Sequence, residues 1–312
     1  MLISRPLRPI VGLTGGLILV AIALAGVAIA DNDGGGRLRT GNHAYISVRD
    51  GDRDLFVRAA AGGAARQLTE DVALDGDPAW SPDGERIAFS SDRSGNLDIW
   101  VIPAAGGAAQ RLTASDAPDL QPSWSPDGQR VVFVSIRDGS SNLFIVDVAD
   151  GSEKQLTDIP EIVAYPAWSP DGRTIAFTIV RELNFVLASQ IAVVPATGGD
   201  VVQLTSAPGL NHQAAWSPDG SQIAYTAVPE GNLPDERSSI AVIPAAGGDP
   251  IFLTDNAWGD FDPSWSPDGA RIVFVSNRDG LRQLYVMSAE GLNPVRLSAG
   301  AIDFDPAWSP SD

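Results

Sequence analysis

Short runs of alternating apolar and polar residues recur along most of the chain. In a typical unit, a run ending in Trp-Ser-Pro is followed by one such as RIAFS, then one such as DIWVIP, then one ending in Leu-Thr or Leu-Ser. Alternation over four to eight residues, bounded by Gly, Pro, Asp and Asn, indicates half-buried β-strands. No stretch between these runs has a convincing helical period. Each unit is therefore predicted to form four short strands.

The Trp-Ser-Pro motif sets the length of the repeat. It occurs at intervals of 44, 44, 48, 49 and 43 residues, with its tryptophans at Trp80, Trp124, Trp168, Trp216, Trp265 and Trp308. The first five copies continue as Ser-Pro-Asp-Gly, which has the residue preferences of a type I turn. Insertions near 179–189 and 226–239 explain the two longest intervals and are predicted to be long loops. The tryptophans are predicted to pack between neighbouring units.

Four antiparallel strands in each repeat of this length predict a β-propeller. The first unit begins at HAYIS (43–47) with no Trp-Ser-Pro strand before it, and the chain ends with DPAWSP (305–310) and no strands after it. The two fragments complete each other, and joining them hides an open strand edge. The predicted fold is all-β: a six-bladed β-propeller over residues 41–312, closed by the C-terminal strand and preceded by one N-terminal hydrophobic helix.

The first forty residues have a different pattern. Residues 10–30 carry no charge, follow Arg5 and Arg8, and end in Ala-Ile-Ala, which has the small-x-small form of a signal-peptidase site. The run is also long enough to span a bilayer as a helix. Residues 1–30 are therefore predicted to be a signal peptide or a membrane anchor, and 31–40 a linker. Both alternatives place the remainder outside the cytoplasm, either membrane-anchored or secreted and periplasmic.

Composition excludes several classes of function. The 312 residues carry a net charge of −18 and include no cysteine and two histidines. The acidity argues against nucleic acid as a partner, and the lack of cysteine removes thiolate metal sites and cysteine nucleophiles. The chain contains no GxSxG, HExxH or phosphate-binding glycine loop. We therefore assign no catalytic residue and do not expect an enzyme.

The repeat resembles that of a known family. The pattern PxWSPDGxxIAF, followed by SxRDG, GG and LT, is similar to the WD40-like (PD40) repeat of the TolB-type six-bladed propellers. The resemblance covers about 41–312 and implies the propeller fold, which is a scaffold for unrelated activities. Periplasmic TolB carries an α/β domain ahead of its propeller, whereas a hydrophobic segment and a linker precede the repeats here.

Carboxylates gather before three of the tryptophans. Asp-x-Asp pairs precede Trp80, Trp265 and Trp308, which belong to consecutive blades of a closed ring. These pairs predict six carboxylates on one arc of one rim: Asp75, Asp77, Asp260, Asp262, Asp303 and Asp305. Like charges held close together raise one another's pKa values or require a cationic partner.

The arginine of the SxRDG segment is one candidate partner. It follows the aromatic residue of the second strand by four positions, and strand alternation places it on the same face as the acids. It occurs at Arg49, Arg93, Arg137, Arg181 and Arg278. In one interpretation, each arginine pairs with a nearby aspartate and holds its loop.

Two other interpretations assign binding to these residues. Asp77, Asp262 and Asp305 could hold a cation such as Ca²⁺, which takes oxygen ligands. Alternatively, the six aspartates, with Arg49, Arg93, Arg137 and Arg278, form a surface for a protein or a basic peptide. No cofactor is required by either interpretation.

The sequence thus predicts an extracytoplasmic propeller scaffold that binds protein or peptide partners of the cell envelope through its loop-rich face. Membrane contact is expected through the N-terminal segment if that segment is retained. The alternative is a propeller hydrolase that acts on carbohydrate or ester substrates.

Overall fold

All the regular structure in the described part of the chain is β. The computed structural model describes residues 42–49, 52–59, 64–183, 186–232, 236–255, 257–298 and 301–310. These residues form twenty-four strands and no helix, so none of them belongs to a helix that could cross a membrane. The predicted all-β class is confirmed. The predicted N-terminal helix and linker lie outside the described residues.

Four sheets contain four strands each. Sheet 1 runs β24 (Ile302–Trp308), β1 (Asn42–Arg49), β2 (Asp52–Ala59), β3 (Arg66–Gln67). Sheet 2 runs β4 (Asp75–Trp80), β5 (Arg86–Ser91), β6 (Asp98–Pro103), β7 (Gln110–Arg111). Sheet 3 runs β8 (Asp119–Trp124), β9 (Arg130–Arg137), β10 (Ser140–Asp147), β11 (Glu153–Gln155). Sheet 6 runs β20 (Asp260–Trp265), β21 (Arg271–Ser276), β22 (Gln283–Ser288), β23 (Val295–Arg296).

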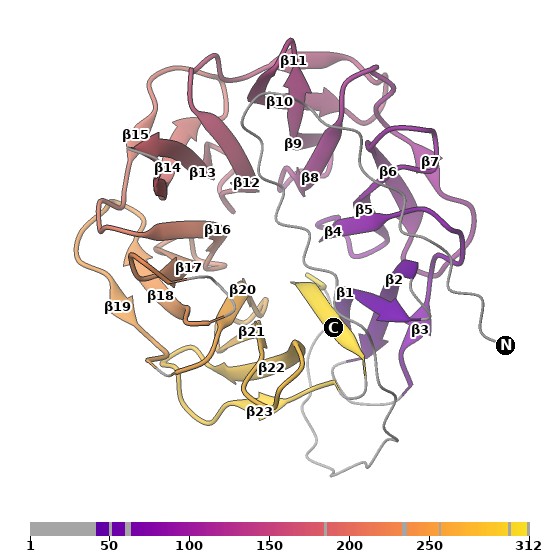
Figure 1. Ribbon diagram of the computed structural model, residues 1–312. Helices are drawn as coiled ribbons and strands as arrows, with labels where there is room; N and C mark the ends of the chain where they lie inside the picture. The colour runs from indigo at the N-terminus through magenta and orange to yellow at the C-terminus, as the bar shows by residue number, and fades with distance from the viewer. Residues whose placement is uncertain are drawn as a thin grey trace, which may run out of the picture.

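The remaining eight strands form two such groups joined by one parallel bridge between Ser189 and Leu210. Sheet 4 is β12 (Ile162–Trp168), β13 (Thr174–Leu183), β14 (Val186–Pro195) and β15 (Val202–Gln203). Sheet 5 is β16 (Leu210–Trp216), β17 (Gln222–Val228), β18 (Ser239–Pro244) and β19 (Ile251–Phe252). The sheets are arranged radially, as in a propeller, with the Trp-Ser-Pro strands nearest the centre and the shortest strands outermost (Figure 1).

One predicted loop is a strand extension instead. The residues near 179–189 continue β13 and β14 as a paired ladder from Ile179–Gln190 to Leu183–Val186. Apolar and β-branched residues are frequent on both strands here, so the inserted backbone satisfies its hydrogen bonds by pairing with itself. The other insertion leaves β17 at Val228 and rejoins the sheet at Ser239, as predicted for a loop.

The Ser-Pro-Asp-Gly segment closes the hairpin between an inner strand and the second strand of its sheet.

 In sheet 2, the Gly84 N–H donates to the Ser81 carbonyl at 2.9 Å, and Gly84 has a φ of 70° that favours glycine. The Asp83 carboxylate accepts hydrogen bonds from the Ser81 hydroxyl and the Glu85 N–H. The same Ser-Pro-Asp-Gly sequence recurs in sheets 3 to 6, so this end of the sheets, the turn-rich face, has short connections.

The tryptophans pack between sheets, as predicted. Trp80 of β4 lies in a core with Ile46 and Leu55 of sheet 1, and Trp124 of β8 packs on sheet 2 in the same way. The Trp80 Nε1–H donates to the Ala307 carbonyl, and the Trp124 Nε1–H donates to the Ala79 carbonyl, both at 3.1 Å. Each of these two indoles therefore joins its own sheet to the one before it by apolar contact and by a hydrogen bond.

The two ends of the described chain lie in one sheet. β24 pairs with β1 in an antiparallel register that places Trp308 opposite His43. The two rings are in edge contact, with centroids 4.0 Å apart, and Trp308 also packs on Val273 and Val286 of sheet 6. The C-terminal strand therefore contacts both its own sheet and the neighbouring one.

We predict that Trp308→Ala destabilises the protein by about 3–5 kcal/mol, because it removes a buried indole between two sheets. Trp308 is 7% exposed, whereas Trp258 is 43% exposed, so Trp258→Ala is a matched control and should cost far less. Denaturant unfolding of both variants measures the difference. Equal stability of the two variants would show that Trp308 does not hold β24 in place.

A second prediction concerns His43, which is buried beside Trp308. Burial, with smaller effects from Arg271 and Arg58, lowers the pKa of His43 from 6.5 to about 4. The unfolded chain therefore binds more protons than the folded chain between these values. Neutral His43 therefore makes its full contribution to the free energy of unfolding above pH 6.5. This contribution is lost as the pH falls toward 4, and the loss is about 2–3 kcal/mol at pH 4.5.

The variant His43→Phe keeps an aromatic ring against Trp308 but cannot be protonated. Between pH 7 and pH 4.5, the unchanged protein should lose about 2–3 kcal/mol more stability than His43→Phe. Urea unfolding at both pH values tests this. Parallel pH dependence of the two proteins would mean that His43 does not titrate in this range.

Candidate functional site

The six inner strands all bulge at the third residue before their tryptophan. At that point the pairing with the second strand shifts register, for example between Gly76 and Ala79 in β4. The residue at the bulge has a left-handed φ of 50° to 59° in all six strands: Asp77, Gln121, Tyr165, Gln213, Asp262 and Asp305. A left-handed conformation is unusual for residues other than glycine and costs on the order of 1–3 kcal/mol.

The residue after each bulge explains part of this geometry. Five of the six inner strands place proline there, as in Asp77-Pro78. Proline has no N–H to donate to a ladder and is tolerated at bulges and on edge strands. Aspartate adopts the left-handed conformation more readily than glutamine or tyrosine. The surrounding sheets must therefore hold Gln121, Tyr165 and Gln213 in a conformation that these residues disfavour.

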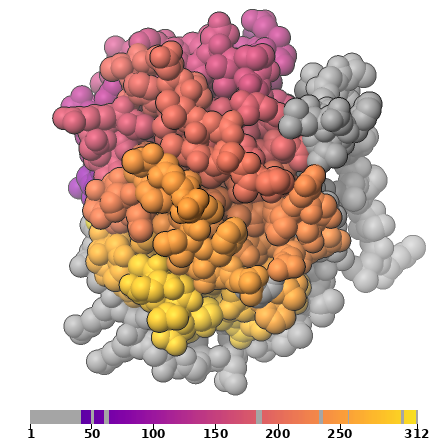
Figure 2. All heavy atoms as spheres, turned by 90° about the vertical axis from the view of Figure 1, so that its left-hand side faces the viewer, coloured from indigo at the N-terminus to yellow at the C-terminus, as the bar shows by residue number. Residues whose placement is uncertain are grey.

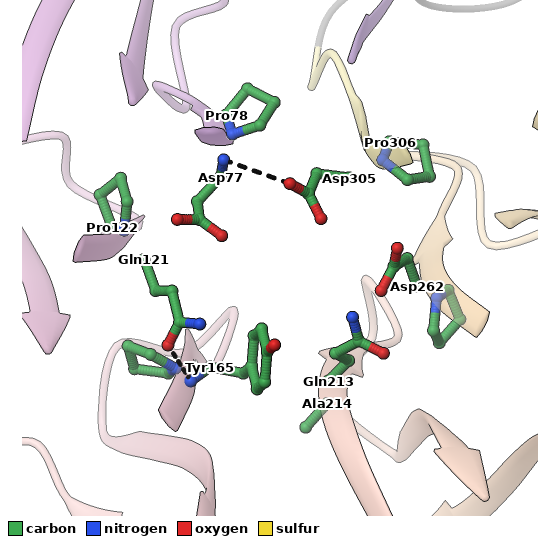
Figure 3. Close-up of a pocket in the computed structure, with 12 residues that line it drawn as sticks. Asp77, Pro78, Gln121, Pro122, Tyr165, Gln213, Ala214, Asp262, Asp305 and Pro306 are labelled. Atoms are coloured by element: carbon green, nitrogen blue, oxygen red, sulfur yellow. Dashed lines mark hydrogen bonds between the residues drawn. The ribbon is translucent and has the colours of Figure 1, made fainter. Parts of the chain in front are cut away.

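The six bulge residues converge on a central pocket. It has a cavity volume of about 170 Å³, and its walls are these six residues and the residue that follows each. Asp262, Asp305 and Asp77 come from successive sheets and form one half of the wall, while Gln121, Tyr165 and Gln213 form the other half (Figure 3). The described residues that line the pocket include no lysine or arginine.

Hydroxyl groups behind the wall link neighbouring sheets. The Ser90 hydroxyl donates to Asp77 Oδ2 at 3.0 Å and accepts the Gln121 N–H at 3.0 Å. At the other boundary between the acidic and neutral halves, the Thr226 hydroxyl donates to Gln213 Oε1 at 2.9 Å and accepts the Asp262 N–H at 3.1 Å. These contacts fix the bulge of one sheet against the bulge of the next.

The acidic half of the wall is electrostatically strained. Burial raises the pKa of Asp305 well above the usual value for a carboxyl, and the carboxylates of Asp77 and Asp262 raise it further. Burial also raises the pKa of Asp77, although the Ser90 hydroxyl opposes this effect. The Asp77 N–H donates to Asp305 Oδ2 at 3.4 Å. A positive charge placed among these carboxylates would relieve their mutual repulsion.

The other half of the wall is neutral at physiological pH. Burial raises the pKa of the Tyr165 phenol, and the three aspartates across the pocket raise it further. His212 lies beside Tyr165, with ring centroids 6.1 Å apart, and burial lowers the pKa of His212 to about 4. The Tyr165 N–H donates to Gln121 Oε1 at 2.7 Å. This half of the wall therefore presents uncharged amide and phenol groups to the pocket.

The aspartates five residues before the tryptophans occupy a different environment. Asp75 and Asp260 are buried within their sheets, and each carboxylate is held by one arginine. Arg93 Nη2 lies 2.9 and 3.1 Å from the two oxygens of Asp75, and Arg278 Nη2 lies 3.0 and 3.1 Å from those of Asp260. In these two sheets, the arginine pairs with the nearby aspartate and holds its turn, which is the first interpretation that the sequence allowed.

The equivalent arginines of sheets 3 and 4 also form ion pairs. Arg137 Nη2 lies 3.8 Å from Asp119 Oδ1 and is closer to Glu153, at 2.5 Å. Arg181 Nε donates to Glu161 Oε1 at 3.1 Å. Each of these arginines thus has a carboxylate partner nearby in the sequence, which balances its charge.

Sheet 1 departs from this arrangement. Asp303 is 2% exposed and lies opposite Ser47 in the ladder, but Arg49 forms no ion pair with it among the described residues. Arg49 is exposed, donates from Nε to the Ser47 hydroxyl at 3.3 Å, and stacks on the Phe56 ring at 4.2 Å. Burial accordingly raises the pKa of Asp303.

The structure therefore divides the six predicted aspartates into two sets. It brings Asp77, Asp262 and Asp305 together around one pocket, and it buries the other three in separate sheets. Gln121, Tyr165 and Gln213 complete the pocket and were not among the predicted site residues. Their position three residues before a tryptophan was a sufficient signal, because the residues at that position lie at equivalent places in all six strands.

Among the described residues, no group of three or more His, Asp or Glu side chains has a geometry that could hold a metal ion. The Ca²⁺ site predicted at Asp77, Asp262 and Asp305 thus stays a prediction.

Comparison with known families identifies two propeller models. The TolB beta propeller domain model matches residues 117–234 and 188–312. The model of the Tricorn protease N-terminal beta propeller domain matches residues 46–142. No curated protein sequence matches the chain.

Solved structures show the same architecture. TolB from Acinetobacter baumannii is 24% identical, with a TM-score of 0.74 over 87% of this chain and 67% of that one. A putative TolB from Agrobacterium tumefaciens is 23% identical, with a TM-score of 0.66 over 86% of this chain and 94% of that one. An oligogalacturonate lyase in complex with manganese is 17% identical, with a TM-score of 0.57 over 84% and 74% of the two chains. At these identities the likeness concerns the fold alone.

The arginine–aspartate pairs generate a third prediction. Arg93→Met should destabilise the protein by about 3 kcal/mol, because it leaves the Asp75 carboxylate buried without its counter-ion. Arg49→Met is the matched control, since Arg49 has no ion pair with Asp303, and it should cost less than about 1 kcal/mol. Thermal or denaturant unfolding compares the two. Similar losses would mean that the Arg93–Asp75 pair is not what stabilises this turn.

Proposed function

The chain belongs to the TolB beta propeller domain family, and from this premise we propose that it is an extracytoplasmic scaffold that binds a protein or peptide partner. We interpret sheets 1 to 6 as the six blades of a propeller ring, closed by the pairing of β24 with β1. The interpretation is supported by the radial arrangement and by the Trp80–Ala307 hydrogen bond between sheets 2 and 1.

The proposed binding surface is the loop-rich face, at the end of the sheets opposite the Ser-Pro-Asp-Gly turns. Connections between the second and third strands, and between one sheet and the next, leave from this face. It carries the extended β13–β14 hairpin and the long connection between Val228 and Ser239. Binding residues are commonly found on loops that a rigid scaffold positions, whereas short turns serve mainly to close hairpins.

The observation that carries the proposal is the composition of the central pocket. Three carboxylates from successive sheets meet there, and no basic side chain of the described chain lines the wall. Burial, together with the carboxylates of Asp77 and Asp262, raises the pKa of Asp305, so the ionised groups reduce the stability of the folded protein. Residues that reduce stability and are held in left-handed conformations are typical of binding sites. We infer that the partner supplies a cationic group, such as an arginine or lysine side chain.

Ca²⁺ is the alternative occupant of the same pocket. It prefers six to eight oxygen ligands, which carboxylates and the amide oxygens of glutamines could supply in part. The organic cation is favoured here because the side-chain oxygens of Gln121 and Gln213 already accept hydrogen bonds from the Tyr165 N–H and the Thr226 hydroxyl. The two ligands are distinguished by direct titration.

The extracytoplasmic location rests on the amino-terminal sequence. Residues 10–30 are uncharged and follow two arginines, which is typical of a signal peptide or a membrane anchor. Partners are therefore expected in the cell envelope.

The test is isothermal titration with acetyl-Ala-Arg-Ala-amide, with the corresponding Gln peptide, and with CaCl₂. We expect the Arg peptide to bind, and the triple variant Asp77→Asn, Asp262→Asn, Asp305→Asn to abolish binding. The same variant should be about 1–2 kcal/mol more stable than the parent, because it removes buried, mutually repelling charges.

Three exposed aspartates, Asp116, Asp200 and Asp249, allow a control with the same change in net charge. Their replacement by asparagine should leave peptide binding unchanged. If both triple variants lost peptide binding equally, the loss would be explained by the change in net charge and not by the pocket. Binding of Ca²⁺ alone would assign the pocket to the metal, and turnover of a glycoside or ester substrate would support the hydrolase alternative instead.

A further inference from the structure

The outermost strands differ between the two halves of the ring. Each of the six is two or three residues long, and every residue in it is exposed to solvent. In sheets 1 to 3 they carry polar or charged residues: Arg66-Gln67, Gln110-Arg111 and Glu153-Lys154-Gln155. In sheets 4 to 6 the first position is apolar: Val202, Ile251 and Val295, which are 55%, 61% and 51% exposed.

The difference is not caused by a shift in strand pairing. In every sheet, one residue of the outermost strand pairs with an apolar residue at the equivalent place on the third strand, as Gln110 does with Val101 and Ile251 does with Val242. The six outer residues at this place are Arg66, Gln110, Lys154, Val202, Ile251 and Val295. The same structural position is therefore polar on three successive sheets and apolar on the next three.

The apolar half is most pronounced at β19. Phe252, next to Ile251, is 56% exposed, and Leu292, close to β23, is 59% exposed. Strands β15, β19 and β23 follow one another along the outside of the ring (Figure 1), and β15 and β19 lie on the side that Figure 2 turns toward the viewer. Exposed strand edges are usually protected by charged residues, and this half lacks that protection in β19. Exposed apolar residues at equivalent places on three successive sheets are typical of a contact surface.

We propose that this apolar outer arc, formed by Val202, Ile251, Phe252, Leu292 and Val295, rests on the surface of a lipid bilayer. The length of chain before β1 identifies the occupant. Residues 10–30 are an uncharged run of 21 residues, which is sufficient to span a bilayer. Only residues 31–41 separate that run from β1, and these reach at most roughly 40 Å when extended. A membrane that holds residues 10–30 therefore lies within reach of the ring.

A second copy of the chain fits the arc less well. The net charge of −18 makes two copies repel each other. Each outer strand also offers few residues, whereas a stable protein interface buries about 800 Å² on each partner. A bilayer needs no complementary shape, and the tether raises its local concentration, so weak insertion of a few side chains suffices. The acidity of the chain makes apolar contact, rather than attraction to anionic lipid, the source of binding.

This contact fixes how the ring is presented. Because the arc lies on the outer circumference, the axis of the ring runs parallel to the membrane plane. The loop-rich face and its central pocket then open sideways, along the membrane surface, and stay accessible to a partner. The polar outer strands of sheets 2 and 3 face away from the lipid.

The absence of cysteine from the sequence allows a direct test. Single variants Ile251→Cys and Val295→Cys, with Gln110→Cys and Lys154→Cys as matched controls, are labelled with an environment-sensitive fluorophore. The full chain is reconstituted in phosphatidylcholine vesicles that contain a nitroxide-labelled lipid. We expect several-fold stronger quenching at 251 and 295 than at 110 and 154. Adding Ile251→Glu and Phe252→Glu should reduce the quenching at 295 without lowering the melting temperature.

Equal quenching at all four positions would overturn the proposal. So would cross-links between Ile251→Cys chains that form independently of lipid, which would assign the arc to a second copy, or recovery of a soluble chain that lacks residues 1–30. None of these outcomes changes the titration of the central pocket, so this inference and the proposed function fail separately.

Discussion

Contacts between neighbouring sheets depend on the tryptophan at the end of each inner strand. A four-stranded sheet with two apolar faces cannot bury both of them alone, and here each indole covers the preceding sheet while its own sheet is covered by the next. The Trp80 and Trp124 rings also donate to carbonyls just before the preceding tryptophan, so the inner strands are tied together at one level. Arg86 and Arg130 stack on Trp124 and Trp168 at 4.7 and 5.0 Å, which shields these rings from solvent. With the inner strands fixed in this way, the bulges three residues earlier converge on one pocket.

That pocket combines a regular scaffold with an irregular set of side chains. The backbone at the six bulges is nearly identical, yet the side chains are acidic in three successive sheets and neutral in the other three. Ser90 and Thr226 bridge adjacent bulges in the same manner, although one donates to a carboxylate and the other to an amide. The scaffold thus allows the chemistry of the wall to vary without a change in its shape, which is why the fold by itself does not identify the ligand.

The sequence was sufficient to predict the strands, the turns and the position of the tryptophans, because each depends on local alternation and on turn residues. It also predicted that acids would gather on consecutive units. The sequence did not distinguish the aspartates that line the pocket from those buried within the sheets. The two sets lie three and five residues before the tryptophan, and only a β-bulge, which the alternation of apolar and polar residues does not reveal, directs them to different places. Asp75 and Asp77 are two residues apart and would lie on the same face of a regular strand. The left-handed turn at Asp77 directs it to the centre, while Asp75 stays within its sheet beside Arg93. The extension of β13 and β14 was also not predicted. The segment near 179–189 was interpreted as a loop because this repeat is longer than the others, and its apolar residues were not considered.

The pairing of β24 with β1 has a consequence for how the chain reaches its folded state. Trp80 and Ala307 are 227 residues apart, and the strand that covers the edge of β1 is the last of the described strands. Sheets 2 to 6 can form from neighbouring segments, but sheet 1 is incomplete until the final residues are available. Contacts of such large sequence separation are slow to form. A chain that emerges from its N-terminus during synthesis would therefore carry an unpaired β1 edge until β24 is available, and sheet 1 would be the last sheet to be completed.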